Sequence, residues 1–279
     1  MEKRTVLITG CSSGIGLALA EEFSRQGYKV LATARKVDSI NHLKGDSIEI
    51  GSLDVTNAES IRECIGRFMK TNDRIDVLVN NAGFALFGPM AEIPIREVRR
   101  QFETNCIGAV AMVQSVLPYM PKKTGSKIVN IGSISGILTT PFAGCYCATK
   151  SAIHSLSDAM RMELAPFGIQ VATVQPGSIR SSFSDKSSKD MDSYRDAKSM
   201  YHKVADSIVS RAYESQQNPT KAEDLARSLV RLIGKKHTPA VIRLGNMSFK
   251  VPFLAAILPR PVIDMILTKR SRLQRLGTT

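Results

Sequence analysis

Tyr146 and Lys150 stand four residues apart in the run Cys145-Tyr-Cys-Ala-Thr-Lys150, and Ser133 precedes the tyrosine by thirteen residues. If this run is helical, the phenol and the ammonium group project from one face, one turn apart. A neighbouring ammonium favours the phenolate. We therefore expect Lys150 to lower the pKa of Tyr146 from about 10 toward the working pH, where proton transfer is efficient. With a serine hydroxyl to bind the same substrate oxygen, the three residues predict a general-acid site that reduces a carbonyl or oxidises an alcohol.

A glycine-rich turn near the N-terminus adds context, because Tyr-x-x-x-Lys alone also describes a half-buried tyrosine beside a solvated lysine. Residues 5–8 are a short apolar, β-branched run that predicts a buried parallel strand. The turn Thr-Gly-Cys-Ser-Ser-Gly-Ile-Gly follows at residues 9–16, and then apolar residues recur at helical spacing. Gly10 permits the tight turn, Gly14 lets the backbone approach a pyrophosphate, and Gly16 allows close helix–strand packing. We expect a dinucleotide phosphate site here; an ordinary glycine turn is the alternative.

The end of the second predicted strand bears on the choice between NAD and NADP. An NAD site places a carboxylate there to bind the ribose 2′-hydroxyl. Here the residues are Ala34, Arg35 and Lys36, so the acid is missing and two cations follow. A 2′-phosphate suits such cations, and we expect NADP(H) as the cofactor with Arg35 as a ligand. A solvated loop position for Arg35 is the alternative, since charged side chains are mostly exposed.

Further motifs occur in order: Asn80-Asn-Ala-Gly83, Asn105 and Pro176-Gly177. With the glycine turn, Ser133 and Tyr146-x-x-x-Lys150, they make residues 4–245 resemble the short-chain dehydrogenase/reductase family. The resemblance implies that Tyr146 is the catalytic acid/base and that Lys150 both lowers its pKa and holds the nicotinamide ribose. Ser133 would bind the substrate oxygen, and Asn105 resembles the asparagine that helps to hold a proton-relay water.

The resemblance also implies a cofactor site made by the glycine turn and the ends of several strands. Asp54 matches the residue that contacts the adenine, Asn81 would lie by the adenosine ribose, and Ile179 and Ser181 match positions near the nicotinamide. Many NADP-using relatives have a basic residue where this chain has Ser13, so Arg35 must carry most of the 2′-phosphate recognition, assisted by a hydrogen bond from Ser13. The implied cofactor-binding residues are Gly10, Ser12, Ser13, Gly14, Ile15, Gly16, Arg35, Asp54, Asn81, Tyr146, Lys150, Ile179 and Ser181.

The substrate is expected to be a small, lipophilic carbonyl compound or alcohol. The chain looks nearest to NADP-dependent aldehyde or ketone reductases and to retinol- and 17β-hydroxysteroid-type dehydrogenases, and its tail is similar to that of acyl-dihydroxyacetone-phosphate reductases. An apolar pocket would be lined by Phe84, Leu86, Phe87, Phe142, Tyr194, Met200 and Tyr201, although these residues are equally plausible as ordinary core. The polar segment 183–220 suits a mobile lid, with a disordered loop as the alternative. A 3-ketoacyl-thioester reductase and a non-enzymatic NADP-binding sensor or scaffold are alternative functions.

Seven strand-like runs alternate with helical patterns, which predicts one α/β domain with a doubly wound, Rossmann-like parallel sheet. The domain is expected to span residues 1–245, with its lid at about 183–220 and a C-terminal extension at 246–279. The predicted strands are Thr5–Ile8, Val30–Thr33, Ile48–Leu53, Val77–Asn80, Ile128–Ile131, Val171–Val174 and Val241–Leu244. The length of 279 residues suffices for a substantial core.

Composition narrows the remaining classes. An odd number of cysteines, five, without a secretory signal favours reduced thiols and a cytoplasmic protein. The four histidines are scattered and form no ligand pattern, so we expect no metal site. The net charge is +13, but no nucleic-acid motif accompanies it, and we expect no nucleic-acid partner. By resemblance, the protein is expected to form a homodimer or a homotetramer.

The C-terminal extension combines apolar runs with positive charge. Residues 220–279 hold twelve lysines and arginines against three acids. The apolar runs are far shorter than the roughly twenty residues that span a bilayer, and Pro252, Pro259 and Pro261 interrupt them. Two interpretations stay open at equal weight: the segment covers the substrate mouth or a partner subunit, or it lies on a membrane surface as a peripheral anchor.

Overall fold

The computed structural model describes residues 3–181 and 191–277. Within them, seven strands form one parallel sheet in the order β3-β2-β1-β4-β5-β6-β7, which confirms the predicted doubly wound architecture. In register, Val6 of the central strand β1 lies opposite Val30 on one side and Val77 on the other. The strands are β1 (Thr5–Ile8), β2 (Lys29–Ala34), β3 (Ile48–Ser52), β4 (Val77–Asn80), β5 (Lys127–Ile131), β6 (Gln170–Pro176) and β7 (Val241–Leu244).

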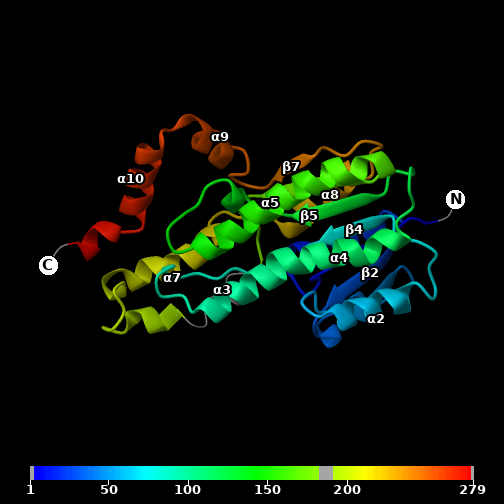
Figure 1. The fold of residues 1–279 in the computed structure, drawn as a ribbon, viewed down its shortest axis with the longest axis horizontal. Coiled ribbons are helices and arrows are strands. Elements are labelled where there is room, and N and C mark those ends of the chain that lie inside the picture. Colours follow the sequence, from blue (N-terminus) through cyan, green and yellow to red (C-terminus); the bar gives the residue numbers. More distant parts are fainter. Residues whose placement is uncertain (1–2, 182–190, 278–279) are drawn as a thin grey trace.

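Helices cover both faces of the sheet, so the domain has three layers (Figure 1). The helices are α1 (Gly14–Arg25), α2 (Ala58–Phe68), α3 (Ile95–Phe102), α4 (Gly108–Val116), α5 (Gly144–Leu164), α7 (Ala205–Tyr213), α8 (Ala222–Ile233), α9 (Lys250–Ile257) and α10 (Arg260–Arg270). On one face, α1 and α8 pack together over Val6 and Ile8 of β1. On the other, α2, α4 and α5 cover Leu7. Because alternate residues of β1 enter different cores, the strand must be apolar throughout, as its sequence is.

The order of the strands brings the predicted site residues to one edge of the sheet. Ser13, Arg35, Asn81, Ser133 and Ile179 all follow the carboxyl ends of strands β1, β2, β4, β5 and β6. The order in which strands are added reverses between β1 and β4: β2 and β3 are added on one side of β1, and β4 lies on its other side. In open parallel sheets, the ligand site lies at this switch point, outside the carboxyl ends of the strands.

The segment between β6 and α8 is largely helical in its described part. After Met191 it forms three short 3-10 turns and α7, and Met191, Val204 and Ile208 bury their side chains in a third apolar cluster. The predicted lid at 183–220 therefore includes ordered elements, whereas residues 182–190 lie outside the described part of the chain.

Beyond β7, α9 and α10 form an arm that extends from the sheet and turns back toward α7 (Figure 1). Pro259 and Pro261 lie at the start of α10 and separate it from α9, as expected. Pro252, by contrast, lies in the first turn of α9, where a missing N–H costs nothing, and it does not interrupt the helix. In the described part of the chain, we find no helix that is both long and apolar enough to cross a bilayer.

Candidate active site

Tyr146 and Lys150 lie one turn apart near the beginning of α5, as the spacing predicts. The Lys150 Nζ atom is 5.7 Å from the centre of the Tyr146 ring and donates a 2.7 Å hydrogen bond to the carbonyl oxygen of Ile131, at the end of β5. Lys150 is buried and Tyr146 half-buried. The bond to β5 fixes the ammonium group beside the phenol and ties α5 to the edge of the sheet.

The pKa of Tyr146 differs from the one that its spacing to Lys150 predicts. Burial raises the pKa of Tyr146 to about 12, although a hydrogen bond with Ser133 and the charge of Arg211 oppose this shift. Burial also lowers the pKa of Lys150 to about 8. The prediction that Lys150 brings the tyrosine pKa below 10 is thus wrong for the described structure, because removing the phenolate from water outweighs the favourable interactions. Tyr146 consequently holds its proton at neutral pH.

Ser133 lies directly after β5 and Gly132, with its side chain toward Tyr146. Its Oγ accepts a 3.1 Å hydrogen bond from the Ser135 N–H, and its own backbone N–H donates to Nε2 of His154 at 3.4 Å. Burial and the nearby Lys150 lower the pKa of His154 to about 4, so the imidazole is neutral at physiological pH and can accept this bond. Sequence reasoning missed His154. Its signal was the spacing 146, 150, 154, which places all three side chains on one face of α5.

Asn105 lies in a π-helical turn, Glu103–Ile107, that joins α3 to α4. Such turns are rare, and they often occur at functional sites. The Asn105 side chain is buried and bonded on three sides: Oδ1 accepts from the Phe84 N–H, and Nδ2 donates to the Phe84 carbonyl and to Oγ1 of Thr149. Thr149 precedes Lys150, so Asn105 is bonded to α5 directly beside Lys150.

The glycine turn has the geometry that an anion site needs. Gly10 and Gly14 adopt φ angles of +75° and +60°, which other residues rarely tolerate. A Cβ on Gly16 would lie 2.4 Å from the Gly10 carbonyl oxygen, so only glycine lets α1 begin this close to β1. The first N–H groups of α1 then face the carboxyl edge of the sheet. A dinucleotide pyrophosphate fits this cradle.

Asn81 supports the glycine turn from β4. Its Nδ2 donates to the carbonyl oxygens of Thr9 and Gly10 at 2.9 and 3.0 Å. Oγ1 of Thr9 in turn accepts hydrogen bonds from the N–H groups of Asn81 and Ala82. This reciprocal set fixes the turn against the end of β4, so the Asn81 amide group is directed to the protein backbone.

Arg35 and Asp54 follow the ends of β2 and β3. Arg35 is exposed, and its guanidinium makes no hydrogen bond or ion pair to any other described residue. Asp54 is half-buried, and its Oδ1 accepts bonds from the N–H and hydroxyl of Thr56, which hold the loop. Both lie at the carboxyl edge, so the adenosine half of a dinucleotide would meet a cation in place of a carboxylate at β2.

The loop after β6 crosses the glycine turn. A Cβ on Gly14 would lie 3.0 Å from the Cβ of Ser181, so the predicted cofactor residues Gly14 and Ser181 are neighbours. Gln216 holds this loop: its Oε1 accepts from the Ser181 N–H, and its Nε2 donates to the Ile179 carbonyl. Gln216 was not predicted, because it lies thirty-five residues from Ser181 without any motif around it.

A family model described as short chain dehydrogenase matches residues 4–192. The chain belongs to the short-chain dehydrogenase family. The chain is 35% identical to the uncharacterized oxidoreductase YusZ of Bacillus subtilis strain 168, over 85% of this chain and 87% of the relative. It is 33% identical to a 3-ketodihydrosphingosine reductase of Bacteroides thetaiotaomicron, over 88% and 90% of the two chains. It is therefore an oxidoreductase of a family that binds a nicotinamide cofactor.

Two solved structures superpose well on the chain. A short-chain dehydrogenase from Streptomyces avermitilis matches with a TM-score of 0.78 at 27% identity, covering 100% of both chains. The closed form of a serine dehydrogenase in complex with NADP+ matches with a TM-score of 0.72, also at 27% identity, over 88% of this chain and 95% of that one.

The residues predicted to line the substrate pocket divide into two groups. Phe87, Phe142 and Tyr201 pack in the third apolar cluster around Tyr146, and the centres of the Phe87 and Tyr146 rings are 6.5 Å apart. Met200 is instead 77% exposed, and the Phe84 ring stacks under Arg100. Placing Met200 in the pocket lining is therefore wrong for the described structure, because its backbone sits on an exposed turn.

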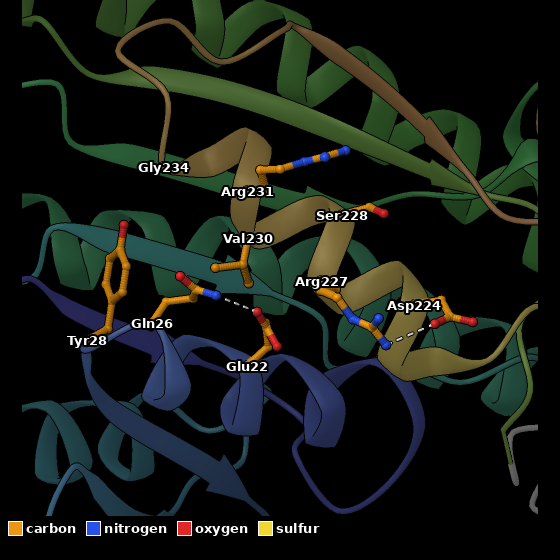
Figure 2. A pocket seen from close by; sticks show the side chains of 9 residues that line it. All are labelled: Glu22, Gln26, Tyr28, Asp224, Arg227, Ser228, Val230, Arg231 and Gly234. Atoms are coloured by element: carbon orange, nitrogen blue, oxygen red, sulfur yellow. Dashed lines mark hydrogen bonds and ion pairs between the residues drawn. The ribbon is translucent and has the colours of Figure 1, made fainter.

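A separate hollow of about 620 Å³ lies between α1 and α8 (Figure 2). Its lining includes Glu22, whose buried carboxylate accepts a hydrogen bond from Gln26 and pairs with Arg25. None of the predicted site residues lines this hollow. We therefore assign this hollow no part in the reaction.

Proposed function

We propose that this protein is an NADP(H)-dependent oxidoreductase that reduces an aldehyde or ketone to an alcohol, or catalyses the reverse reaction, on a lipophilic substrate. The observation that carries the proposal is the hydrogen-bonded pair of Ser133 and Tyr146, with the ammonium group of Lys150 fixed beside the phenol. The raised pKa of Tyr146 favours reduction at neutral pH, since the phenol is then protonated and can act as the acid.

Each site residue has its own role in the proposed reduction. The substrate carbonyl oxygen accepts hydrogen bonds from the hydroxyls of Ser133 and Tyr146. When bound, NADPH supplies the hydride that adds to the carbonyl carbon. As the C=O π electrons move to oxygen, Tyr146 donates its proton there, and Lys150 stabilises the phenolate that remains. Asn105, held near Thr149, is suited to position the water that returns a proton.

The preference for NADP over NAD is supported by Arg35 at the end of β2. Its guanidinium is exposed and makes no bond to another described residue, so it is free to bind a 2′-phosphate bidentately. The reverse preference would require a carboxylate at this edge, and Ala34 occupies the place where the sequence of an NAD site would supply one.

The decisive experiment is NADPH oxidation against a panel of fatty aldehydes, retinoids, steroids, medium-chain ketones and an acyl-dihydroxyacetone phosphate. Tyr146→Phe should lose at least about a hundredfold in turnover while binding NADPH normally, because it lacks only the transferable proton. Near wild-type turnover of this variant would refute the role of Tyr146. Activity on a carrier-linked 3-ketoacyl thioester alone would favour that alternative, and NADPH binding without turnover of any carbonyl would favour a sensor or scaffold.

We further propose that the C-terminal arm makes a peripheral contact with an anionic membrane surface. Phe249, Phe253 and Ile257 recur every fourth residue, which places them on one face of α9, and they are 67%, 62% and 56% exposed. Five cations and a single acid, Asp264, accompany them between residues 250 and 272. An exposed apolar helix face with cationic flanks is typical of interfacial binding. Separately, we propose that the protein assembles into a homodimer or homotetramer, as is usual for the family.

A further inference from the structure

An arginine of α7 approaches the candidate active site from the substrate side. The Arg211 side chain is only 14% exposed, and its Nε donates a 2.8 Å hydrogen bond to Oγ1 of Thr140, which precedes α5. Its Cζ is 5.5 Å from the centre of the Phe87 ring, and Phe87 in turn packs against Tyr146. The charge of Arg211 opposes the rise that burial causes in the pKa of Tyr146, so its electric field reaches the phenol.

This positive charge is incompletely neutralised. The carboxylate of Glu214 is shared: its Oε2 lies 3.6 Å from Nε of Arg211, and its Oε1 lies 3.0 Å from Nε of Arg270 on α10. The shorter contact goes to Arg270. Two guanidinium groups on one carboxylate leave a net positive charge, and the partner that is less exposed, Arg211, lies beside the apolar cluster around Tyr146.

The terminal nitrogens of Arg211 are available to a ligand. Both described polar contacts of this side chain use Nε, and its two Nη groups bond to no other residue among 3–181 and 191–277. A largely buried guanidinium with unused donors is unfavourable unless it gains a ligand. Its planar pair of N–H groups matches an oxyanion in a bidentate arrangement.

We infer that Arg211 is a specificity-determining residue that binds an anionic group of the substrate. This inference rests on the proposed function and narrows it: the preferred substrates are lipophilic carbonyl compounds that also carry a carboxylate or a phosphate monoester. The apolar chain lies among Phe87, Phe142 and Tyr201, the carbonyl faces Tyr146, and the anion pairs with Arg211. Amino ketones and other cationic substrates are disfavoured by the same positive charge.

The kinetic test compares matched substrates. A series of oxo acids, with three to eight carbons between carbonyl and carboxylate, is set against the corresponding methyl esters, primary amines and oxoalkyl phosphates. We expect wild-type kcat/KM to be highest for the acid or the phosphate and lowest for the amine. In Arg211→Gln, the ratio of acid to ester should fall by about tenfold or more, the size expected for losing a charge-assisted hydrogen bond. A general effect of the substitution on Tyr146 changes kcat/KM for the acid and the ester alike, so it does not change the acid-to-ester ratio.

Two variants serve as controls. Arg211→Lys keeps the charge but not the planar fork, so it should retain part of the acid preference. Arg227→Gln on α8 removes an exposed arginine that pairs with Asp224, and it should leave the ratio unchanged. Circular dichroism checks that each variant is folded. An acid-to-ester ratio that is the same in wild type and Arg211→Gln would overturn the inference.

A binding measurement separates this inference from the proposed function. Calorimetry with the NADP+-saturated protein compares decanoate, decyl phosphate and decylamine, none of which can be reduced. Tight binding of an anion that Arg211→Gln weakens about tenfold or more supports the inference even if no carbonyl is turned over. Equal affinity for decanoate and decylamine contradicts it. If the protein turns over no neutral ketone but its binding of anions depends on Arg211, only the proposed function is contradicted.

Discussion

The backbone N–H of Ser133 donates to the imidazole of His154, which lies two turns beyond Tyr146 on the same helix. The serine is therefore held from α5, although it belongs to the loop after β5. His154 can accept this bond only while neutral, and burial with the nearby Lys150 ensures that by lowering its pKa to about 4. The histidine is thus a positioning residue for the hydroxyl that would bind the substrate oxygen.

Replacing His154 by Leu should lower kcat/KM by about fivefold, close to the ~1 kcal/mol of one neutral hydrogen bond. KM for NADPH should stay unchanged, and His154→Gln, whose amide oxygen can accept the bond, should recover part of the loss. A purely structural histidine would instead affect the KM values of substrate and NADPH alike.

His154 also makes stability depend on pH. In the unfolded chain it binds a proton below about pH 6.5, whereas in the folded protein it resists protonation until about pH 4. The unfolded state then binds more protons, so the free energy of unfolding falls as the pH drops from 6.5 to 4. Urea titrations at pH 7 and pH 5 measure how much free energy of unfolding is lost between these two pH values. This loss should be smaller for His154→Gln than for wild type. An identical loss would mean that His154 is not buried as described.

The alkaline limit of the reduction is expected to come from Lys150. Its pKa is about 8, whereas that of Tyr146 is about 12, so the lysine loses its proton first as the pH rises. We expect kcat/KM for carbonyl reduction to decline above about pH 8. Lys150→Arg, which stays charged, should move this decline to higher pH even if its overall rate is lower. A wild-type profile that is flat to pH 10 would contradict the assignment.

Arg35 should decide the choice of cofactor. Arg35→Ala should reduce the ratio of kcat/KM for NADPH to that for NADH by about tenfold or more, and Arg35→Asp should invert it, since a carboxylate repels the 2′-phosphate and binds a 2′-hydroxyl. Lys36→Ala is the matched control at the next residue. If wild type already prefers NADH, the NADP assignment fails.

Membrane contact is tested with vesicles and point variants. Full-length protein should sediment with phosphatidylserine vesicles, less with phosphatidylcholine vesicles, and less again as salt rises. Phe249→Ser/Phe253→Ser should release it, whereas Ile107→Ser, which removes a 53% exposed apolar residue from the π-helical turn before α4, should not. If the protein never binds vesicles, the membrane proposal is wrong, and contact with a partner subunit becomes the interpretation of the arm.

The C-terminal arm differs in burial along its length. Leu273 and Leu276 pack against the third apolar cluster, as Tyr146 does, so the end of the arm belongs to the packing around the candidate site. Phe249, Phe253 and Ile257 of α9 are instead largely exposed. The sequence showed an apolar pattern and cations, but only the path of the chain shows which apolar residues of the arm are packed and which are exposed.

The strands and the position of the site could be predicted from sequence because their signals are local. A β-branched run such as residues 5–8 predicts a strand, and the motif after it predicts a phosphate-binding turn. Gln216 and Arg211 could not be found in this way, and for His154 the spacing gives its face of α5 but not its hydrogen-bond partner. They act through contacts with Ser133, Ser181 and Thr140, at sequence separations from twenty-one to seventy-one residues.

The pKa of Tyr146 shows a second limit of the sequence. The spacing to Lys150 was correctly interpreted as proximity, but a pKa depends on the difference between a favourable charge and the loss of hydration. The loss of hydration is set by Phe87, Phe142 and the elements after β6 that close over the ring. No local pattern gives their combined effect.

Tyr146, Lys150 and His154 lie at successive turns of one 21-residue helix, α5. The glycine turn follows β1, which lies between β2 and β4 in the sheet. The distance between the Tyr146 hydroxyl and a nicotinamide bound at that turn would therefore depend on how α5 packs against β6, the π-helical turn Glu103–Ile107 and the 3-10 turn after Ser133. Substitutions in these contacts should lower the rate without changing the spacing of the three side chains on α5.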